Sequence, residues 1–126
     1  MSTRIPLPLA PMPDASLPRT RAEGGDVMSE IDREVKTNRI FLYMKGTPDF
    51  PMCGFSARVV QILNHLGAKF GSCDVLADPE KREAIKVYGK WPTLPQLYVD
   101  GELVGGCDIV TEMFQSGELQ PLVAPR

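Results

Sequence analysis

The run Ile40-Phe-Leu-Tyr-Met44 constrains the fold more than any other part of this chain of 126 residues. It is continuously apolar and rich in residues that favour strands. Such a run is typical of a strand buried on both faces, because a strand with one wet face would alternate apolar and polar residues. We therefore expect a sheet around residues 40–44 that is covered on both sides.

Helices are predicted on either side of this strand. Ser29, with Asp32 three residues later, resembles a helix start, and Asp78-Pro79 offers a capping side chain followed by proline at the first helical position. Gly67 stands where a C-terminal cap is expected. The predicted helices span residues 29–38, 54–66 and 79–88, and a last helix follows Asp108.

Three further strands are predicted over residues 70–75, 96–99 and 102–104. Asp100-Gly101 between the last two is a strong hairpin signal. The helix between the first two strands is long enough for a parallel crossover. The predicted fold class is therefore α/β, with a mixed four-stranded sheet flanked by helices.

Residues 1–27 differ from the rest of the chain. Five prolines precede residue 19, whereas every aromatic residue lies at or after Phe41. We expect residues 1–27 to be a disordered proline-rich extension and residues 28–126 to be one domain. The extension could be dispensable, with Met28 as the true start, or it could be a targeting or binding segment.

Charge and hydropathy exclude some function classes. The net charge is −2, with 14 basic and 16 acidic residues, so no basic field favours nucleic-acid binding. No run approaches the roughly 18 apolar residues of a membrane span, and no secretory signal is present. We expect neither a nucleic-acid partner nor a membrane.

Cys53 is the candidate reactive residue. It stands where a loop meets a predicted helix, so unpaired N–H groups and the helix dipole favour its thiolate, and Lys45 can reach the same locality. A structural cysteine is the alternative. Position 56, where a local dithiol motif needs a second cysteine, holds Ser56. Cys53 must therefore react with another sulfur, from Cys73, Cys107 or a small thiol such as glutathione.

Two further motifs suggest ligand contacts. Trp91-Pro-Thr-Leu-Pro-Gln96 precedes a predicted strand, and a cis bond before Pro95 would leave the Leu94 backbone free to pair with a peptide-like ligand. A rigid loop without a ligand role is the alternative. In Gly105-Gly-Cys-Asp108 a helix start would hold a carboxylate, while Asp108 would pair with an ammonium group or act as a plain N-cap.

Other polar residues give weaker signals. Arg82 and Lys86 share one face of a predicted helix, which by itself indicates a solvated surface unless a carboxylate-rich ligand lies nearby. His65 is the only histidine and is expected on the helix surface. Cys73 is expected to pack within the second strand, without a functional role.

Four motifs together resemble the monothiol glutaredoxins of the Cys-Gly-Phe-Ser type, which have a single glutaredoxin domain and a thioredoxin-like fold. They occur in order, at fitting spacing, and the resemblance covers nearly all of residues 28–123. The motifs are Lys45-Gly-Thr-Pro48, Cys53-Gly-Phe-Ser56, Trp91-Pro-Thr-Leu-Pro-Gln96 and Gly105-Gly-Cys-Asp108.

The resemblance implies roles for individual residues. Cys53 would be the active-site cysteine and the ligand of an iron–sulfur cluster. Lys45, Arg82 and Lys86 would contact the carboxylates of glutathione. Leu94, before cis Pro95, would pair with the glutathione backbone. Cys107 and Asp108 would contact its γ-glutamyl end. In such proteins two chains and two glutathione molecules share one 2Fe–2S cluster, which agrees with the four thiolates that this cluster requires.

The leading functional hypothesis is a homodimeric carrier that transfers 2Fe–2S clusters to apo iron–sulfur proteins. The alternative is a glutathione-dependent thiol–disulfide oxidoreductase that uses Cys53, with Cys107 as an internal resolving thiol in one variant. A redox-sensing interaction module is a third reading. The family also forms mixed complexes with BolA-like proteins, although no residue here points to one. Three thiols do not form a secreted disulfide framework, which favours the bacterial cytoplasm first and the mitochondrial matrix second.

Overall fold

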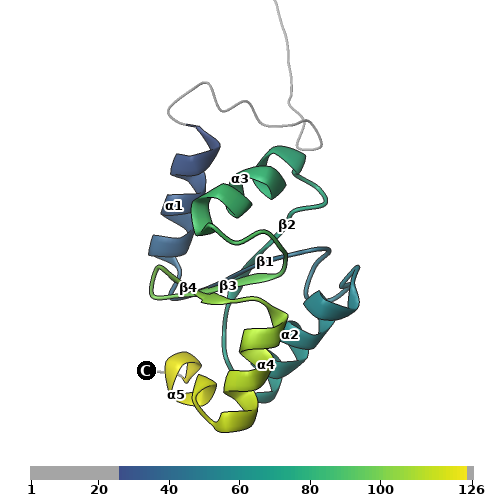
Figure 1. Ribbon diagram of the computed structural model, residues 1–126, viewed down its shortest axis with the longest axis vertical. Coiled ribbons are helices and arrows are strands. Elements are labelled where there is room, and N and C mark those ends of the chain that lie inside the picture. The colour runs from purple at the N-terminus through teal and green to yellow at the C-terminus, as the bar shows by residue number, and fades with distance from the viewer. Residues whose placement is uncertain (1–25, 125–126) are drawn as a thin grey trace, which may run out of the picture.

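The computed structural model describes residues 26–124, in which one four-stranded sheet has the order β2-β1-β3-β4 (Figure 1). The strands are β1 (Ile40–Met44), β2 (Gly71–Asp74), β3 (Gln96–Val99) and β4 (Glu102–Gly105). β1 is parallel to β2 and antiparallel to β3, and β3 is antiparallel to β4. The predicted mixed sheet is confirmed.

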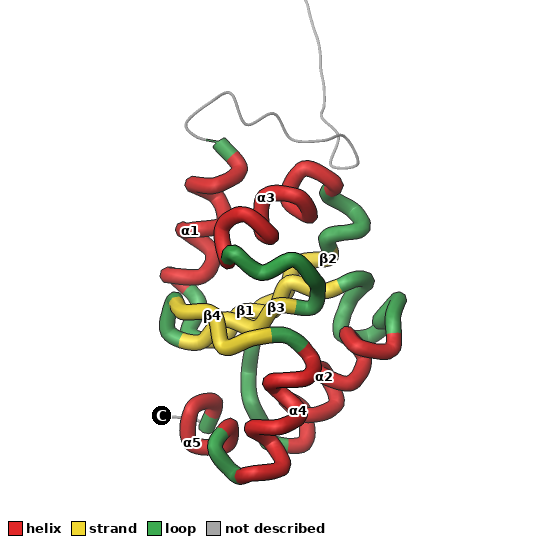
Figure 2. The backbone as a smooth tube through the Cα atoms, in the orientation of Figure 1, coloured by secondary structure: helices red, strands yellow, loops and turns green. Residues whose placement is uncertain are grey.

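Helices lie on both faces of the sheet (Figure 2). The helices are α1 (Val27–Thr37), α2 (Gly54–His65), α3 (Pro79–Gly89), α4 (Cys107–Ser116) and the short α5 (Leu119–Val123). α1 and α3 contact each other over one face, while α2 and α4 contact each other over the opposite face. None of the helices in residues 26–124 has the length and apolarity to cross a membrane.

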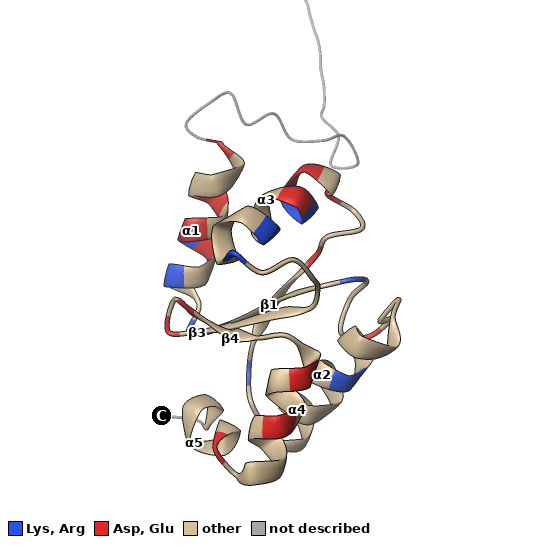
Figure 3. Ribbon diagram, in the orientation of Figure 1, with Lys and Arg blue, Asp and Glu red and all other residues tan. Residues whose placement is uncertain are grey.

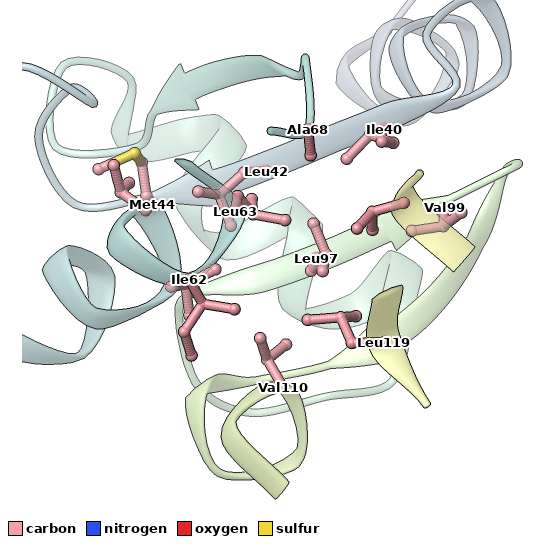
Figure 4. Packing of buried hydrophobic residues seen from close by; sticks show 13 residues of the cluster. Ile40, Leu42, Met44, Ile62, Leu63, Ala68, Leu97, Val99, Val110 and Leu119 are labelled. Atoms are coloured by element: carbon pink, nitrogen blue, oxygen red, sulfur yellow. The ribbon is translucent and has the colours of Figure 1, made fainter. Parts of the chain in front are cut away.

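β1 is buried along its whole length, as its sequence predicts. Its alternate side chains enter two separate cores, because successive residues of a strand point to opposite faces. Ile40, Leu42 and Met44 pack with residues of α2 and α4 (Figure 4), and Phe41 and Tyr43 pack under α1 and α3. This strand holds the two layers of helices together, and its C-terminal end leads directly into the candidate site.

The core under α1 and α3 contains a charged residue. Lys81 is only 2% exposed, and its Nζ lies 2.8 Å from Glu34 Oε2 and 3.5 Å from Glu30 Oε1. The Tyr43 hydroxyl donates to Glu34 Oε1 at 2.7 Å. Burial of the ammonium group is thus compensated by carboxylates of α1, which ties α1 to α3.

Some predicted boundaries were wrong. The N-cap of α1 is Asp26 rather than Ser29, and the Asp26 carboxylate accepts from Ser29 N at 2.9 Å. α4 begins at Cys107 with Gly106 as its N-cap, so Asp108 lies inside the first turn. Helix α5 was not predicted. Residues 1–25 of the predicted extension, which spans residues 1–27, lie outside the described residues.

Candidate functional site

Cys53 is the N-cap of α2, at the loop–helix junction where the sequence predicts it. Its backbone is extended, with φ −155° and ψ 151°, and its carbonyl accepts the first helical hydrogen bond from Ala57 N at 3.0 Å. Its Sγ accepts from Ser56 N at 3.4 Å. A sulfur therefore takes the place of the side-chain oxygen that usually satisfies a first-turn N–H group.

Ser56 lies one turn further along α2 and is fully buried. The Cys53 thiol donates to Ser56 Oγ, with Sγ and Oγ 3.5 Å apart, and the same Oγ accepts from Lys45 N at 3.1 Å. A hydroxyl has one proton to donate. When Cys53 ionises, the Ser56 proton can turn to the thiolate while the Lys45 amide continues to occupy an Oγ lone pair.

These contacts change the acidity of Cys53. Partial burial acts to raise the pKa of the thiol, but hydrogen bonds from the Ser56 side chain and from the Ser56 and Phe55 backbone lower it, and the Lys45 charge lowers it further. The combined effect is a pKa below the ordinary value of a cysteine. The site therefore favours the thiolate, which is both the nucleophile and the metal-binding form of cysteine.

The loop between β1 and α2 places Lys45 beside the thiol. Met52 N donates to Lys45 O at 2.9 Å, and Gly46 N donates to Asp74 Oδ1 at 2.9 Å. Gly46 has φ +91°, and a Cβ at this position would lie 2.5 Å from Phe50 O. A glycine is needed here so that the loop can fold back on itself and hold Lys45 in place.

The loop before β3 is fixed from behind by Gln96. This side chain is completely buried, and its Nε2 donates to Trp91 O at 3.0 Å and to Thr93 O at 3.3 Å. Its Oε1 accepts from the Tyr98 hydroxyl at 2.9 Å. The Leu94–Pro95 peptide bond is cis, as the resemblance implies. No role was predicted for Gln96 from the sequence, although a polar residue at the start of an otherwise apolar strand was a usable signal.

The start of α4 closes against the same loop. A Cβ on Gly106 would lie 3.1 Å from Trp91 Nε1 and 3.3 Å from Pro95 O. The absence of a side chain thus allows the α4 N-terminus to approach the loop that contains Leu94 and Pro95. Because Gly106 is the N-cap, α4 starts at Cys107, before the predicted position.

Two grooves meet at these elements. The larger, of about 870 Å³, lies between α2 and α4, and the smaller, of about 190 Å³, lies between the α4 start and the Trp91–Leu94 region. Phe55, Cys107 and Asp108 line both grooves. The larger groove also contains Lys45 and Cys53, so the acidic thiol opens into a volume that can accept a small peptide.

Comparison with known proteins identifies the family to which this fold and site belong. The family described as glutaredoxin matches residues 40–104, which include β1, Cys53, the cis bond and most of β4. This chain belongs to the glutaredoxin family. The fold is accordingly the thioredoxin-like fold of glutaredoxins, with the predicted four-stranded mixed sheet.

The similar glutaredoxins include monothiol members. "Glutaredoxin 4" of Pasteurella multocida is 54% identical over 99 residues, which cover 79% of this chain and 91% of the relative. "Probable monothiol glutaredoxin 2" of Rickettsia felis is 54% identical over 93 residues, or 74% of this chain and 89% of the relative. The predicted resemblance to monothiol glutaredoxins is confirmed.

Solved structures agree with this assignment. Reduced apo GrxS14 of poplar has a TM-score of 0.67 and 52% identity, over 74% of this chain and 85% of that one. A buckwheat glutaredoxin–glutathione complex has a TM-score of 0.69 over 77% of this chain and 86% of that one. Its sequence identity is 23%, so it supports the fold alone.

The glutaredoxin fold brings together most of the predicted site residues. Four of them line the larger groove and three the smaller; these are Lys45, Cys53, Cys107 and Asp108 in the larger, and Leu94, Cys107 and Asp108 in the smaller. Pro95, which follows Leu94 through the cis bond, is buried and lines neither groove. Arg82 and Lys86 line neither groove, since they lie on α3 over the opposite face of the sheet.

The α3 cations have other surroundings. Lys86 Nζ lies 3.3 Å from Glu83 Oε2 on the same helix. Arg82 Nε is buried and has no hydrogen-bond partner among residues 26–124. Their predicted contacts with glutathione carboxylates therefore stay predictions.

The other thiols differ from Cys53. Cys73 lies in β2, as predicted, and burial raises the pKa of its thiol to about 11. Cys107 lies in both grooves, with its Sγ 3.9 Å from Thr111 Oγ1. None of the three cysteines is in a disulfide bond. His65 is exposed near the end of α2, in agreement with its predicted surface position.

Proposed function

We propose that this glutaredoxin binds glutathione and carries a 2Fe–2S cluster as cargo between two chains, for transfer to apo iron–sulfur proteins. The observation that carries the proposal is a single thiol of lowered pKa, Cys53, which opens into a groove of about 870 Å³ and has Ser56 where a second thiol would stand. Such a thiolate suits an iron ligand, because cluster iron is held by cysteine thiolates.

The count of ligands supports a shared cluster. A 2Fe–2S cluster takes four thiolates. Within residues 26–124, no group of three or more His, Cys, Asp and Glu side chains could hold a metal ion. Two Cys53 thiolates and two glutathione thiolates would complete the set, and exchange of the glutathione would release the cargo without unfolding the protein.

The groove has the polar groups that glutathione requires. The tripeptide carries two carboxylates, one ammonium group and one thiol. Lys45 would pair with a carboxylate, and the free N–H groups at the start of α4 would hold another, while Asp108 would pair with the ammonium group. Cys107 would line the γ-glutamyl end, and the Leu94 backbone would pair with the peptide part.

Arg82 and Lys86 are proposed to contact the carboxylates from α3. This part of the proposal is tested separately, because neither residue lines the two grooves. Glutathione affinity of Arg82→Met and Lys86→Met, measured by calorimetry, should fall severalfold compared with the exposed control Lys36→Met. Unchanged affinity in both variants would restrict the ligand contacts to α2, α4 and the loops.

Anaerobic reconstitution with iron, sulfide and glutathione tests the main proposal. We expect a coloured dimer with two glutathione molecules per cluster, read by absorbance, native mass and thiol analysis. Cys53→Ser should stay colourless and monomeric, whereas the matched control Cys73→Ser should behave as the unsubstituted chain. A colourless monomer from the unsubstituted chain would contradict the proposal.

A second function is favoured by the lowered pKa of the Cys53 thiol in this groove, and Cys107 lines the same groove. The Cys53 thiolate would attack a protein–glutathione disulfide, form a Cys53–glutathione disulfide and release the protein thiolate. A second glutathione thiolate would then attack this disulfide, which yields oxidised glutathione and restores the Cys53 thiolate. Efficient turnover in a glutathione-coupled assay favours this function, and a loss of turnover in Cys107→Ser indicates internal resolution instead.

The domain boundary and the compartment complete the proposal. We propose residues 28–126 as the working domain and a reducing compartment, first the bacterial cytoplasm, as the place where the free thiols operate. The Asp26 carboxylate caps α1, so a chain that begins at Met28 should be less stable than one that begins at Asp26. Both chains should bind the cluster equally if the extension is dispensable.

A further inference from the structure

The two walls of the larger groove carry opposite charges. Lys45 and Arg58 line it from the α2 side, and Asp108 and Glu112 line it from α4. Figure 3 shows acidic positions along α4 and a basic position on the neighbouring α2. Arg58 and Glu112 belong to none of the motifs that the resemblance rests on, so the resemblance implies no role for either residue.

Arg58 and Glu112 are available to another molecule. Both are exposed, and within residues 26–124 neither forms an ion pair or a hydrogen bond through its side chain. In the proposed glutathione complex, Lys45 and Asp108 are used by the ligand. Arg58 and Glu112, one on each wall, are then the charged residues of the groove that glutathione does not contact.

A groove with one basic and one acidic wall is complementary to a copy of itself. When two copies meet face to face through a two-fold axis, the same patch is used on both sides. An axis that runs along the groove places the basic wall of each copy opposite the acidic wall of the other. An axis across the groove would instead place like charges together. The charge pattern therefore selects a single orientation of the pair.

We propose that a second copy of this chain docks on this groove, with Arg58 of each copy paired to Glu112 of the other. The inference rests on the proposed cluster-bridged dimer and specifies what orients it. Because Cys53 lines the same groove, this orientation brings the two thiolates to the same interface. Exposed Phe55 and Met52, at 63% and 66%, lie beside Cys53 and offer apolar area to bury in the contact.

Charge reversal tests this pairing in the reconstituted full-length protein. Arg58→Glu and Glu112→Arg should each weaken dimer association at least tenfold, because like charges then meet twice in the symmetric pair. The double variant should recover to within about threefold of the unsubstituted chain, since the pairs are re-formed with exchanged signs. Dimer dissociation is measured by analytical ultracentrifugation over a concentration series at low salt, where surface pairing is strongest.

Two controls identify the cause of any change. Arg33→Glu reverses an exposed arginine on α1, over the opposite face, and should leave association unchanged. Glutathione affinity of the monomeric apo-protein should stay within twofold in Arg58→Glu and Glu112→Arg. A parallel loss of glutathione affinity would show that these residues act on the ligand, and it would overturn the pairing.

The possible failures are distinguishable. If the unsubstituted chain forms no cluster-bridged dimer, the proposed function and the pairing both fall. If that dimer forms but the single reversals leave it unchanged, or the double variant does not recover, only the pairing falls.

Discussion

Substitution of Ser56 by alanine should reduce the reactivity of Cys53 while leaving the thiol in place. The Ser56 hydroxyl lies 3.5 Å from Cys53 Sγ, and its hydrogen bond is the largest of the influences that lower the pKa of Cys53. Alanine removes this hydroxyl but keeps the Ser56 N–H contact to the sulfur, because that contact is made by the backbone. The pKa of Cys53 should therefore rise toward its ordinary value.

The size of the effect follows from the geometry. A hydrogen bond to a charged group contributes about 1.5–3 kcal/mol. The 3.5 Å separation and the partial exposure of Cys53 place this one at the lower end. About 1.4 kcal/mol corresponds to a tenfold change in an equilibrium, so the acid dissociation constant of the Cys53 thiol should fall about tenfold.

The assay is the rate of Cys53 alkylation by iodoacetamide as a function of pH, with the site of reaction identified by mass spectrometry. Site identification separates Cys53 from Cys73 and Cys107. Ser72→Ala is the matched control, because Ser72 is an exposed serine in β2. Its pH profile should match that of the unsubstituted chain.

Folding must be monitored in the same samples. Loss of the Ser56 hydroxyl also removes the acceptor of Lys45 N, which should lower the free energy of unfolding by about 1–3 kcal/mol. The measurement is therefore made well below the unfolding temperature of the variant. A folded Ser56→Ala protein with an unchanged Cys53 profile would refute the hydroxyl as the source of the lowered pKa.

Three further predictions concern stability. Lys81→Met should lower the unfolding free energy by about 2–3 kcal/mol in denaturant titrations, because it leaves the partly buried carboxylates of Glu30 and Glu34 without their cation. The same substitution of Lys36, which is 64% exposed, should cost under about 0.5 kcal/mol, and equal losses would contradict this. The Cys73 thiol has a pKa of about 11 in the folded chain, against an ordinary value of 9.0. It therefore contributes folding stability that is present below pH 9 and is lost as the pH rises toward 11. Between pH 8 and pH 10.5 the free energy of unfolding of the unsubstituted chain should thus fall by about 2 kcal/mol more than that of Cys73→Ala. Parallel curves of unfolding free energy against pH would contradict this prediction. Gly46→Ala should cost about 1–3 kcal/mol more than Gly117→Ala in thermal unfolding, because both have positive φ but only Gly46 would place a Cβ against the backbone; equal costs would refute the steric argument.

Features set by short stretches of sequence could be predicted. The apolar run of β1 is buried on both faces, and Asp78-Pro79 starts α3 with Asp78 as the N-cap. Asp100 and Gly101 both have positive φ, 54° and 83°, as the predicted hairpin turn requires. In each case the residues that determine the structure are neighbours in the chain, so local rules are sufficient.

Features set by contacts between distant segments could not be predicted. The close approach of Gly106 to Trp91 joins two separate loops, and the burial of Lys81 depends on Glu34, which is 47 residues away. For Arg82 and Lys86, the helical spacing indicates a shared face but not the face of the sheet on which that helix lies. Their distance from the grooves is therefore a property of the topology.

Ser56 affects both the acidity of the Cys53 thiol and the partners with which that thiol can react. A cysteine at position 56 would provide an internal sulfur, and Cys53 could then be oxidised within its own helix. The serine removes that route, yet its hydroxyl still supports the thiolate and also binds the Lys45 amide. Cys53 is thus ionised readily but has no sulfur one helical turn away to pair with. Its remaining partners lie across the groove or in another molecule, which is why the same local geometry suits both a glutathione ligand and a second chain.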